Sequence, residues 1–309
     1  MRRMDVMIYD CAIIGGGPAG LNAALVLGRS RRKTVLFDDD NGRNLVTRES
    51  HGFITRDGIQ PEELKKLARQ DIAKYDSVEL KKKKIVRVER LSETHYELTT
   101  DEGETFHSIK IILAAGVKEK LPNIPDIEKF YGTSLYSCPY CDGWELKDQP
   151  LAIIADKNVY ALAKKVYTWS EDLAVFTNGM GRLEEEEKAS LAKHGIKVYE
   201  DIISGLEGGN GQLRSVRLED GTLIDRVGGF TTPLWNHSTS FADELGCEQN
   251  SYGGIKTDEY GRTNVWNVYA AGDASLIVPS QLVIAAGEGS AAAIGVNGDL
   301  SNEYFDSEE

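Results

Sequence analysis

A glycine-rich segment near the start of the chain constrains the fold more than any other feature. It reads Gly15-Gly16-Gly17-Pro18-Ala19-Gly20 and follows the apolar run 10–14, which we predict to be a strand. In this pattern the first glycine permits a tight turn, the second admits a phosphate close to the backbone, and the third lets a helix pack on the strand. A helix that begins here presents free N–H groups to a diphosphate. The segment therefore predicts a dinucleotide-binding βαβ unit.

The acidic residue that ends the second expected strand supports the same interpretation. Thr34–Phe37 has the composition of a buried strand, and Asp38 follows it directly. An acid about 20 residues after the glycine-rich segment can accept a hydrogen bond from a ribose hydroxyl. Because strand ends are uncertain by a few residues, Asp39 or Asp40 is an alternative acceptor.

The rest of the chain alternates strands and helices. Residues 78–100 predict a hairpin or meander. A second βαβαβ pattern follows, with strands at 151–155, 173–177 and 196–199 and helices at 158–169 and 183–194. After residue 253 we expect a hairpin, a strand at 267–271, a small-residue helix at 281–297 and a polar tail at 301–309. This order indicates an α/β fold and is compatible with a first domain made of two pieces.

The composition narrows the class of protein. The 309 residues suffice for about two domains, and 36 Lys and Arg against 49 Asp and Glu give a net charge of −13. Such a chain repels phosphate backbones, so we expect no nucleic-acid partner and no membrane partner. The most apolar stretch, Ala12–Gly28, contains glycines and Pro18 and is no membrane span. Four cysteines are too few for a secreted disulfide scaffold, which favours a reducing, cytoplasmic location.

Two of the four cysteines form a Cys-x-x-Cys motif. It reads Cys138-Pro139-Tyr140-Cys141 and is followed at once by Asp142. This spacing can close a small reversible disulfide, and a neighbouring carboxylate can move a proton to or from a thiolate. A zinc site and a pair of inert core cysteines are the alternatives, but a closed zinc site needs about four ligands. Cys11 and Cys247 are expected to be buried apolar residues.

A third motif makes the chain similar to a known family. Tyr269-Ala270-Ala271-Gly272-Asp273 follows the glycine-rich segment and the Cys-Pro-Tyr-Cys-Asp-Gly segment at 138–143. The order and spacing of these motifs resemble the low-molecular-weight thioredoxin reductase family of FAD flavoproteins over nearly the whole chain. The resemblance implies a homodimer and two Rossmann-like three-layer nucleotide-binding domains, the second inserted in the first. We therefore expect an FAD domain of residues 1–117 and 245–309 and an inserted redox domain of residues 118–244.

The resemblance also implies where FAD would bind. It assigns the cofactor to Gly15–Gly20 and places Asp273 on the ribityl chain. Asn44 lies in Gly42-Arg43-Asn44-Leu45, where the family has Gly-Gly-Gln-Leu, so this side chain is expected at the flavin. Gln281 is expected near the isoalloxazine, and Ala115, at the end of the strand before Gly116, is included among the cofactor-binding residues.

The same resemblance assigns the redox chemistry. Cys141 would be the sulfur that faces flavin C4a, Cys138 the sulfur that exchanges with the substrate, and Asp142 the acid and base. Glu49-Ser50-His51-Gly52 replaces the usual Glu-Asn-aromatic-Pro, which places His51 near the redox centre. A proton relay and a loop histidine that contacts FAD are the two interpretations of His51.

The chain departs from NADPH-dependent members in its second nucleotide unit. Where they carry a glycine-rich phosphate loop, this chain reads Ala155-Asp156-Lys157-Asn158, and an aspartate there repels a pyrophosphate. The basic cluster for a 2′-phosphate is replaced by Thr177-Asn178-Gly179-Met180, followed by a single arginine, Arg182. Ser280-Gln281 replaces the Arg-Gln of thioredoxin reductases. We therefore do not expect NADPH as the ordinary donor, and the changes resemble flavin dithiol oxidases or reductases with another electron donor.

Together the motifs predict an FAD-dependent enzyme that exchanges electrons between the flavin, the Cys138/Cys141 pair and an external dithiol or disulfide. The partner is a small dithiol or disulfide, or a thioredoxin-like protein. The motifs determine neither the direction of the reaction nor the electron donor. An NADPH-dependent thioredoxin reductase is the first alternative, and a non-catalytic flavin redox sensor is the second.

Overall fold

The computed structural model describes residues 7–155, 157–180, 183–276 and 281–306. The chain divides into two compact units. Unit 1 comprises Met1–Leu45, Phe53–Lys118 and Trp235–Glu309, and unit 2 comprises Val46–Gly52 and Glu119–Leu234. The sequence predicts that the chain returns to the first domain at residue 245, whereas it re-enters unit 1 at Trp235. The short segment Val46–Gly52 belongs to unit 2.

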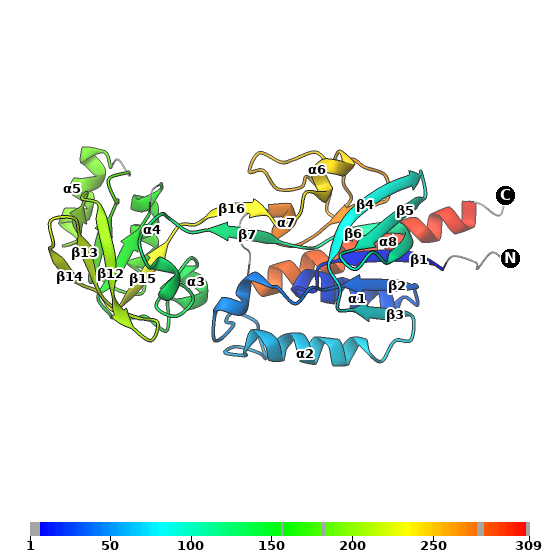
Figure 1. The fold of residues 1–309 in the computed structure, drawn as a ribbon, viewed down its shortest axis with the longest axis horizontal. Helices are drawn as coiled ribbons and strands as arrows, with labels where there is room; N and C mark the ends of the chain where they lie inside the picture. Colours follow the sequence, from blue (N-terminus) through cyan, green and yellow to red (C-terminus); the bar gives the residue numbers. More distant parts are fainter. Residues whose placement is uncertain (1–6, 156, 181–182, 277–280, 307–309) are drawn as a thin grey trace. The chain divides into compact units, whose positions relative to one another are not determined.

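Unit 1 is built on a seven-stranded mixed sheet (Figure 1). Its spatial order is β3-β2-β1-β6-β5-β4, and β17 also pairs with β6. The pairs β1–β2, β2–β3, β1–β6 and β6–β17 are parallel, whereas β4–β5 and β5–β6 are antiparallel. The strands are β1 (Ile8–Ile14), β2 (Thr34–Phe37), β3 (Val78–Lys81), β4 (Ile85–Ser92), β5 (His95–Thr100), β6 (Thr105–Leu113) and β17 (Val268–Ala270).

One strand pairs differently from the sequence prediction. Residues 78–100 predict a hairpin or meander, but β3 pairs in parallel with β2, and β4 and β5 form the antiparallel hairpin. The amphipathic helix α2 (Pro61–Ile72) lies between β2 and β3 in the chain. A helix in that position makes a crossover, which is the connection that parallel strands require.

Helices α1 (Pro18–Arg29) and α8 (Leu282–Asp306) lie side by side on unit 1 (Figure 1). Small residues permit the close approach: a Cβ on Gly289 would lie 2.0 Å from the carbonyl oxygen of Ala19. Ala292 and Ala293 are fully buried in the same apolar cluster. The shorter helical segments of this unit are η1 (Arg43–Val46), whose last residue belongs to unit 2, α6 (Phe241–Leu245) and α7 (Asp273–Leu276).

The prediction of a polar tail from residue 301 is wrong, because α8 continues to Asp306. The polar side chains of this last part have partners in unit 1. The guanidinium of Arg32 donates to Ser301 Oγ at 2.7 Å, and the fully buried ammonium of Lys110 lies 2.6 Å from Glu303 Oε1. These contacts hold the final turns of the helix, although the turns carry few apolar residues.

Unit 2 contains a five-stranded parallel sheet in the order β11-β10-β9-β15-β8. The strands and helices predicted between residues 151 and 199 are all present, each within a few residues of its expected bounds. The strands of this sheet are β8 (Leu135–Tyr136), β9 (Leu151–Ile154), β10 (Leu173–Phe176), β11 (Lys197–Tyr199) and β15 (Gly228–Thr231). The helical segments are η2 (Ile127–Lys129), α3 (Pro139–Asp142), α4 (Val159–Val166) and α5 (Glu185–Lys193).

An antiparallel sheet that the sequence analysis does not anticipate completes unit 2. It joins β12 (Ile203–Gly209), β13 (Gln212–Leu218) and β14 (Leu223–Asp225). Its apolar face packs into one cluster with the parallel sheet, which buries Leu206, Val216 and Phe176. Two further strands, β7 (Val117–Lys120) and β16 (Leu234–His237), form a two-stranded sheet.

The predicted fold class, α/β with two Rossmann-like units, is confirmed. Within the described residues, no helix combines the length and the apolar character that a bilayer crossing requires.

The contact between α1 and α8 makes a prediction for stability. Replacing Gly289 with Ala puts a methyl group against backbone that no side-chain rotation can move, so we expect the free energy of unfolding to fall by about 1–3 kcal/mol. Urea denaturation followed by circular dichroism measures the change. Gly298→Ala on the same helix is the matched control, because a Cβ there meets nothing within 4 Å. Equal denaturation midpoints for the two variants would contradict the prediction.

Candidate active site

The glycine-rich loop of unit 1 is a turn that other residues could not form. Gly15 has a φ of +116°, and a Cβ there would lie 2.3 Å from the carbonyl oxygen of Ala114 and 2.8 Å from Ala115 Cα. A Cβ on Gly20 would lie 1.9 Å from the carbonyl oxygen of Gly15. The first and third glycines therefore permit the tight turn and the close packing of α1 on β1 that the sequence predicts.

Gly17 is the glycine with open space beside it. It is the N-cap of α1, no side chain caps the helix there, and an added Cβ would meet no atom within 4 Å. The start of the helix thus offers backbone N–H groups and room for a ligand to approach the main chain. An anionic diphosphate fits such a position because the helix dipole and these N–H groups both favour negative charge.

Asp38 lies directly against this loop. A Cβ on Gly16 would come within 2.2 Å of the Asp38 carboxyl group, and only 7% of Asp38 is exposed. Its Oδ2 lies 2.7 Å from Lys65 Nζ and 2.7 Å from Arg69 Nη2, both on α2. Two cations therefore hold the carboxylate in place at the end of β2, where a ribose hydroxyl could use its remaining lone pairs.

The two alternative acids differ from Asp38. Asp39 is exposed, whereas Asp40 contacts Lys65, Arg69 and Lys82. Burial by itself would raise the pKa of Asp40, but hydrogen bonds from these three cations outweigh it and hold that pKa well below its usual range. Of the three acids, Asp38 is the one that touches the glycine-rich loop.

A second group of charged residues surrounds Gly272 and Asp273 at the start of α7. A Cβ on Gly272 would lie 2.9 Å from the Cβ of Ala19, so this turn sits on the first turn of α1. Glu288 of α8 accepts hydrogen bonds from the Gly272 N–H at 2.7 Å and from Ser275 Oγ at 2.9 Å. Burial raises the pKa of Glu288, although these two hydrogen bonds oppose the shift.

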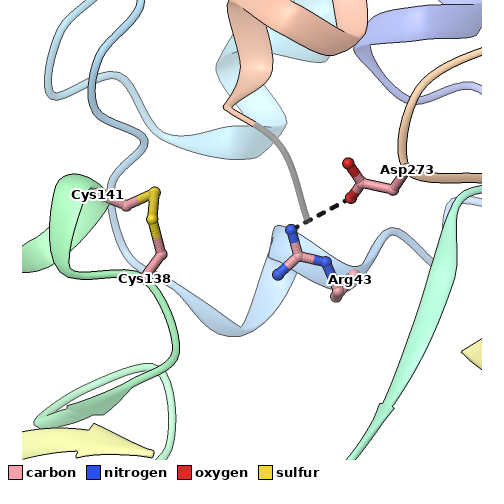
Figure 2. Close-up of a disulfide and its surroundings, with 4 residues drawn as sticks. All are labelled: Arg43, Cys138, Cys141 and Asp273. Atoms are coloured by element: carbon pink, nitrogen blue, oxygen red, sulfur yellow. Dashed lines mark ion pairs between the residues drawn. A yellow bond between two sulfur atoms is a disulfide. The ribbon is translucent and has the colours of Figure 1, made fainter. Parts of the chain in front are cut away.

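Arg43 reaches Asp273 from η1 (Figure 2). Its Nη2 lies 3.5 Å from Asp273 Oδ2. Its guanidinium carbon also lies over the ring of Trp235, 5.4 Å from the ring centroid. No sequence motif points to Arg43, since the two residues of this ion pair are far apart in the chain. Asn44 and Gln281, the other expected flavin contacts, lie on η1 and immediately before α8.

Cys138 and Cys141 form a disulfide in unit 2, with Cα atoms 5.3 Å apart (Figure 2). Cys138 is the N-cap of the short helix α3, and both cysteines are half-buried. Trp169 covers the end of this helix: a Cβ on Gly143 would lie 2.7 Å from its ring. Tyr140, between the two cysteines, meets Trp169 edge to face and is 64% exposed.

His51 and Tyr136 are two further polar residues of unit 2 with defined contacts. Nε2 of His51 lies 3.6 Å from Glu49 Oε2 and 3.7 Å from Glu145 Oε1. Burial, and then the charge of the nearby Asp142, raise the pKa of Tyr136 to about 12. The phenol of Tyr136 therefore stays protonated and donates to the carbonyl oxygen of Thr133 at 2.7 Å. Tyr136 is a residue that no sequence motif points to.

The other two cysteines lie in the core of unit 1. Cys11 on β1 is fully buried, and Cys247 is 9% exposed. Burial raises the pKa of both thiols, which keeps them protonated. Across the described residues, no group of three or more His, Cys, Asp or Glu side chains has an arrangement that could hold a metal ion.

The loop after β9 is where NADPH-dependent relatives are expected to bind a second nucleotide, and in this chain it begins with a buried apolar residue. Ala155 is 1% exposed and belongs to the apolar cluster that also contains Val159 of α4. Asn158 takes the N-cap position of α4 with a positive φ of 55°. Asp156, Arg182 and Ser280, three of the residues at which the sequence departs from NADPH-dependent proteins, lie outside the described residues.

A dinucleotide-type loop in one unit and a Cys-x-x-Cys disulfide in the other are together typical of a flavin disulfide oxidoreductase. The family model for pyridine nucleotide-disulphide oxidoreductases matches residues 9–289, and the chain belongs to this family of oxidoreductase enzymes. The family binds a flavin, FAD, and the residues of unit 1 fit its diphosphate. The predicted resemblance to low-molecular-weight thioredoxin reductases is confirmed.

Several known proteins are similar over most of their length. A putative thioredoxin reductase TrxB from Bacillus anthracis has a structure with a TM-score of 0.93 and 44% identity, covering 96% of this chain and 100% of that one. A probable thioredoxin reductase of Arthroderma benhamiae is 30% identical, over 86% of this chain and 74% of its own length. The structure of HlmI has a TM-score of 0.91 and 31% identity, covering 97% of this chain and 95% of HlmI.

The open space at Gly17 makes a prediction for cofactor binding. We expect Gly17→Ala to weaken FAD binding by about tenfold or more, because the methyl group would occupy the space through which a diphosphate approaches the backbone. Titration of FAD-free protein with FAD, followed by flavin fluorescence, measures the dissociation constant. Gly209→Ala on β12 is the control, since that position is also open. An unchanged dissociation constant for Gly17→Ala would remove the diphosphate from this position.

Proposed function

We propose that the protein is an FAD-dependent thiol–disulfide oxidoreductase that exchanges electrons between the flavin, the Cys138/Cys141 pair and an external dithiol or disulfide. The observation that carries the proposal is the Cys138–Cys141 disulfide, half-buried beside an exposed Tyr140, in a chain of a flavin-binding family. A half-buried disulfide at the start of a short helix is partly exposed, and an attacking thiolate needs such exposure.

The exchange with substrate proceeds through a mixed disulfide. A substrate thiolate attacks Cys138 Sγ, a new S–S bond forms, and the bond to Cys141 breaks, which leaves a thiolate on Cys141. The second substrate thiolate then attacks the substrate sulfur of the mixed disulfide and releases Cys138. The substrate leaves as a disulfide, and its two electrons remain on the cysteine pair. The reverse sequence reduces a disulfide.

Proton movement falls to Asp142 and His51. The carboxylate of Asp142, adjacent to Cys141 in the chain, takes a proton as a thiol becomes a thiolate and returns it in the opposite step. His51, whose Nε2 lies within 4 Å of carboxylate oxygens of both Glu49 and Glu145, is placed to pass that proton on to either of them. Tyr136 keeps its proton and does not compete for this role.

FAD, when bound, supplies a two-electron carrier for the cysteine pair. Gly15–Gly20 would hold its diphosphate, Asp38 its adenosine ribose and Asp273 its ribityl chain. Asn44, Ala115 and Gln281 are assigned to the flavin on the resemblance to the family.

We further infer that NADPH is not the ordinary donor. The support comes from Ala155, which packs into the core at the position where a phosphate loop needs glycine. Without glycine the backbone cannot come close to a pyrophosphate. A small dithiol that passes its electrons through the flavin to oxygen, or a reductase with another electron donor, fits these residues.

The alternative is an NADPH-dependent thioredoxin reductase. The description of the family, pyridine nucleotide-disulphide oxidoreductase, and the names of the proteins similar to this chain favour this function. On either reading the partner is a small dithiol or disulfide, or a thioredoxin-like protein, and the protein is a cytoplasmic homodimer. The cysteine count and the family resemblance support the location and the dimer.

Anaerobic reduction distinguishes the two functions. We expect a small dithiol to bleach the flavin absorbance rapidly and stoichiometric NADPH to leave it unchanged over the same period. Rapid bleaching by NADPH would overturn the assignment of the donor. Cys138→Ser is the control for the cysteine pathway: it should abolish reduction by dithiol, and retained dithiol turnover would favour the flavin sensor instead.

The relay role of His51 has its own test. We expect His51→Gln to lower dithiol turnover by about tenfold or more and to remove one limb of the pH–rate profile. The matched control is His194→Gln, an exposed histidine of unit 2 at the end of α5. Turnover and a pH profile equal to those of the wild type would leave His51 as a loop residue that contacts FAD.

A further inference from the structure

We propose that Trp169 is a positioning residue for the redox step: its ring holds helix α3 so that the thiols of Cys138 and Cys141 stay close enough to form the disulfide. The inference rests on the proposed function, in which this pair is reduced and reoxidised. Two contacts of the Trp169 ring, with Tyr140 and with Gly143, carry it. The sequence motifs give no role to this tryptophan, which comes after the next strand and helix of the chain.

Helix α3 is too short to hold its own conformation. It has four residues, Pro139–Asp142, and its N-cap, Cys138, makes no side-chain capping hydrogen bond. A helix of this length is unstable by itself in water, because fixing the first turn costs more than its few hydrogen bonds return. The disulfide ties the turn together only while the pair is oxidised. In the reduced protein, contacts with the rest of unit 2 must therefore hold the turn.

The Trp169 ring contacts this helix at two places. Tyr140, between the two cysteines, meets the ring edge to face, with the ring centroids 5.4 Å apart. The buried Gly143, the C-cap of α3, lies so close that a Cβ there would be 2.7 Å from Trp169 Cδ2. Pro139, which is also buried, anchors the first turn. The ring thus fixes α3 between its cysteines and at its end.

The backbone that carries Trp169 is itself held in place. Its N–H donates to the carbonyl oxygen of Val166 at 2.8 Å, and its carbonyl oxygen accepts a hydrogen bond from the Asp148 N–H at 2.9 Å. Ser170 Oγ donates to the carbonyl oxygen of Gln149 at 2.6 Å. These bonds join the end of α4 to the chain that follows α3. Trp169 therefore stands on a fixed backbone and can support the helix.

The position of α3 affects how completely the pair is oxidised at equilibrium. When an external disulfide oxidises the pair, one cysteine thiolate forms a mixed disulfide with it and releases one thiol. The second cysteine then displaces the other thiol and closes the Cys138–Cys141 bond, so that two electrons have passed to the external disulfide. This last step is intramolecular, and its equilibrium depends on the fraction of reduced molecules whose two sulfurs are close. Trp169 raises that fraction, whereas the oxidised state is already constrained by its own bond.

The experiment measures the equilibrium of the cysteine pair with glutathione in the FAD-bound, full-length protein. The protein is equilibrated anaerobically at defined ratios of oxidised to reduced glutathione and its thiols are then alkylated. Mass spectrometry gives the oxidised fraction of the pair. The variants are Trp169→Leu and the control Leu162→Ala, which removes a buried apolar side chain of α4 from the core of unit 2. Urea denaturation gives the stability of each variant.

We expect Trp169→Leu to lower the equilibrium constant for disulfide formation by about tenfold, because the reduced pair loses an aromatic edge-to-face contact and the packing on Gly143. Leu162→Ala should lower the denaturation midpoint but leave the equilibrium constant within about twofold of the wild type. An equilibrium constant for Trp169→Leu within twofold of the wild type would overturn the inference. An equal fall for Leu162→Ala would also overturn it, because the effect would then be a general loss of stability.

Tyr140 supplies a second pair of variants, which decides the question if Trp169→Leu does not fold. Its side chain is 64% exposed, so replacing it removes little of the core. Tyr140→Phe keeps the ring that meets Trp169 and should match the wild type. Tyr140→Leu loses that ring and should lower the equilibrium constant by about threefold or more. Equal constants for the two variants contradict the inference.

These outcomes are separate from those that test the proposed function, because the glutathione equilibrium does not require electrons to reach the flavin. If Trp169→Leu shifts the equilibrium as expected but dithiols do not reduce the flavin of the wild type, only the proposed function is contradicted. If dithiols reduce the flavin through the cysteine pair but Trp169→Leu leaves the equilibrium unchanged, only the role of Trp169 is contradicted.

Discussion

Backbone-to-backbone contact at the first turn of α1 is the constraint on which the cofactor site depends. Gly20 lies against Gly15, and Gly289 of α8 lies against Ala19, each so closely that a single methyl group would collide with a carbonyl oxygen. The turn that carries Asp273 sits on the same Ala19. Main-chain atoms cannot escape such contacts by changing rotamer, so the helix start, the acidic turn and the long C-terminal helix hold one another in a single arrangement.

The first βαβ unit could be predicted from the sequence because a local pattern determines it. An apolar run, a glycine segment and an acid at fixed spacing predict β1, α1 and Asp38, and each lies where the pattern puts it. Contacts between distant segments could not be read in the same way. The Arg43–Asp273 ion pair joins two residues of unit 1 that are separated in the sequence by all of unit 2. The final turns of α8 depend on Lys110 and Arg32, which come far earlier in the sequence. Neither pair leaves a local periodicity.

Unit 2 shows that this fold can form without the residues that bind a nucleotide. Its parallel strands and their flanking helices form without a glycine loop after β9, because Ala155 and Val159 fill the core at that point. A sheet of this kind needs apolar residues on both faces, and it does not need a nucleotide. The architecture of unit 2 therefore does not indicate which electron donor the protein uses. The few residues at the ends of its strands are more informative about the donor. The same unit carries the Cys138–Cys141 disulfide at the start of the four-residue helix α3, and Trp169 covers the end of that helix.

The discontinuity of unit 1 has a consequence for its biosynthesis. The strand β17 and the helix α8 complete the sheet and cover α1, but a ribosome makes them only after all of unit 2. Unit 2 is nearly continuous in the chain and can fold while synthesis is still in progress, whereas the small-residue face of α1 stays uncovered until the end. The nascent chain thus exposes the apolar surface of α1 while its middle third is translated. During that interval the chain is most exposed to aggregation.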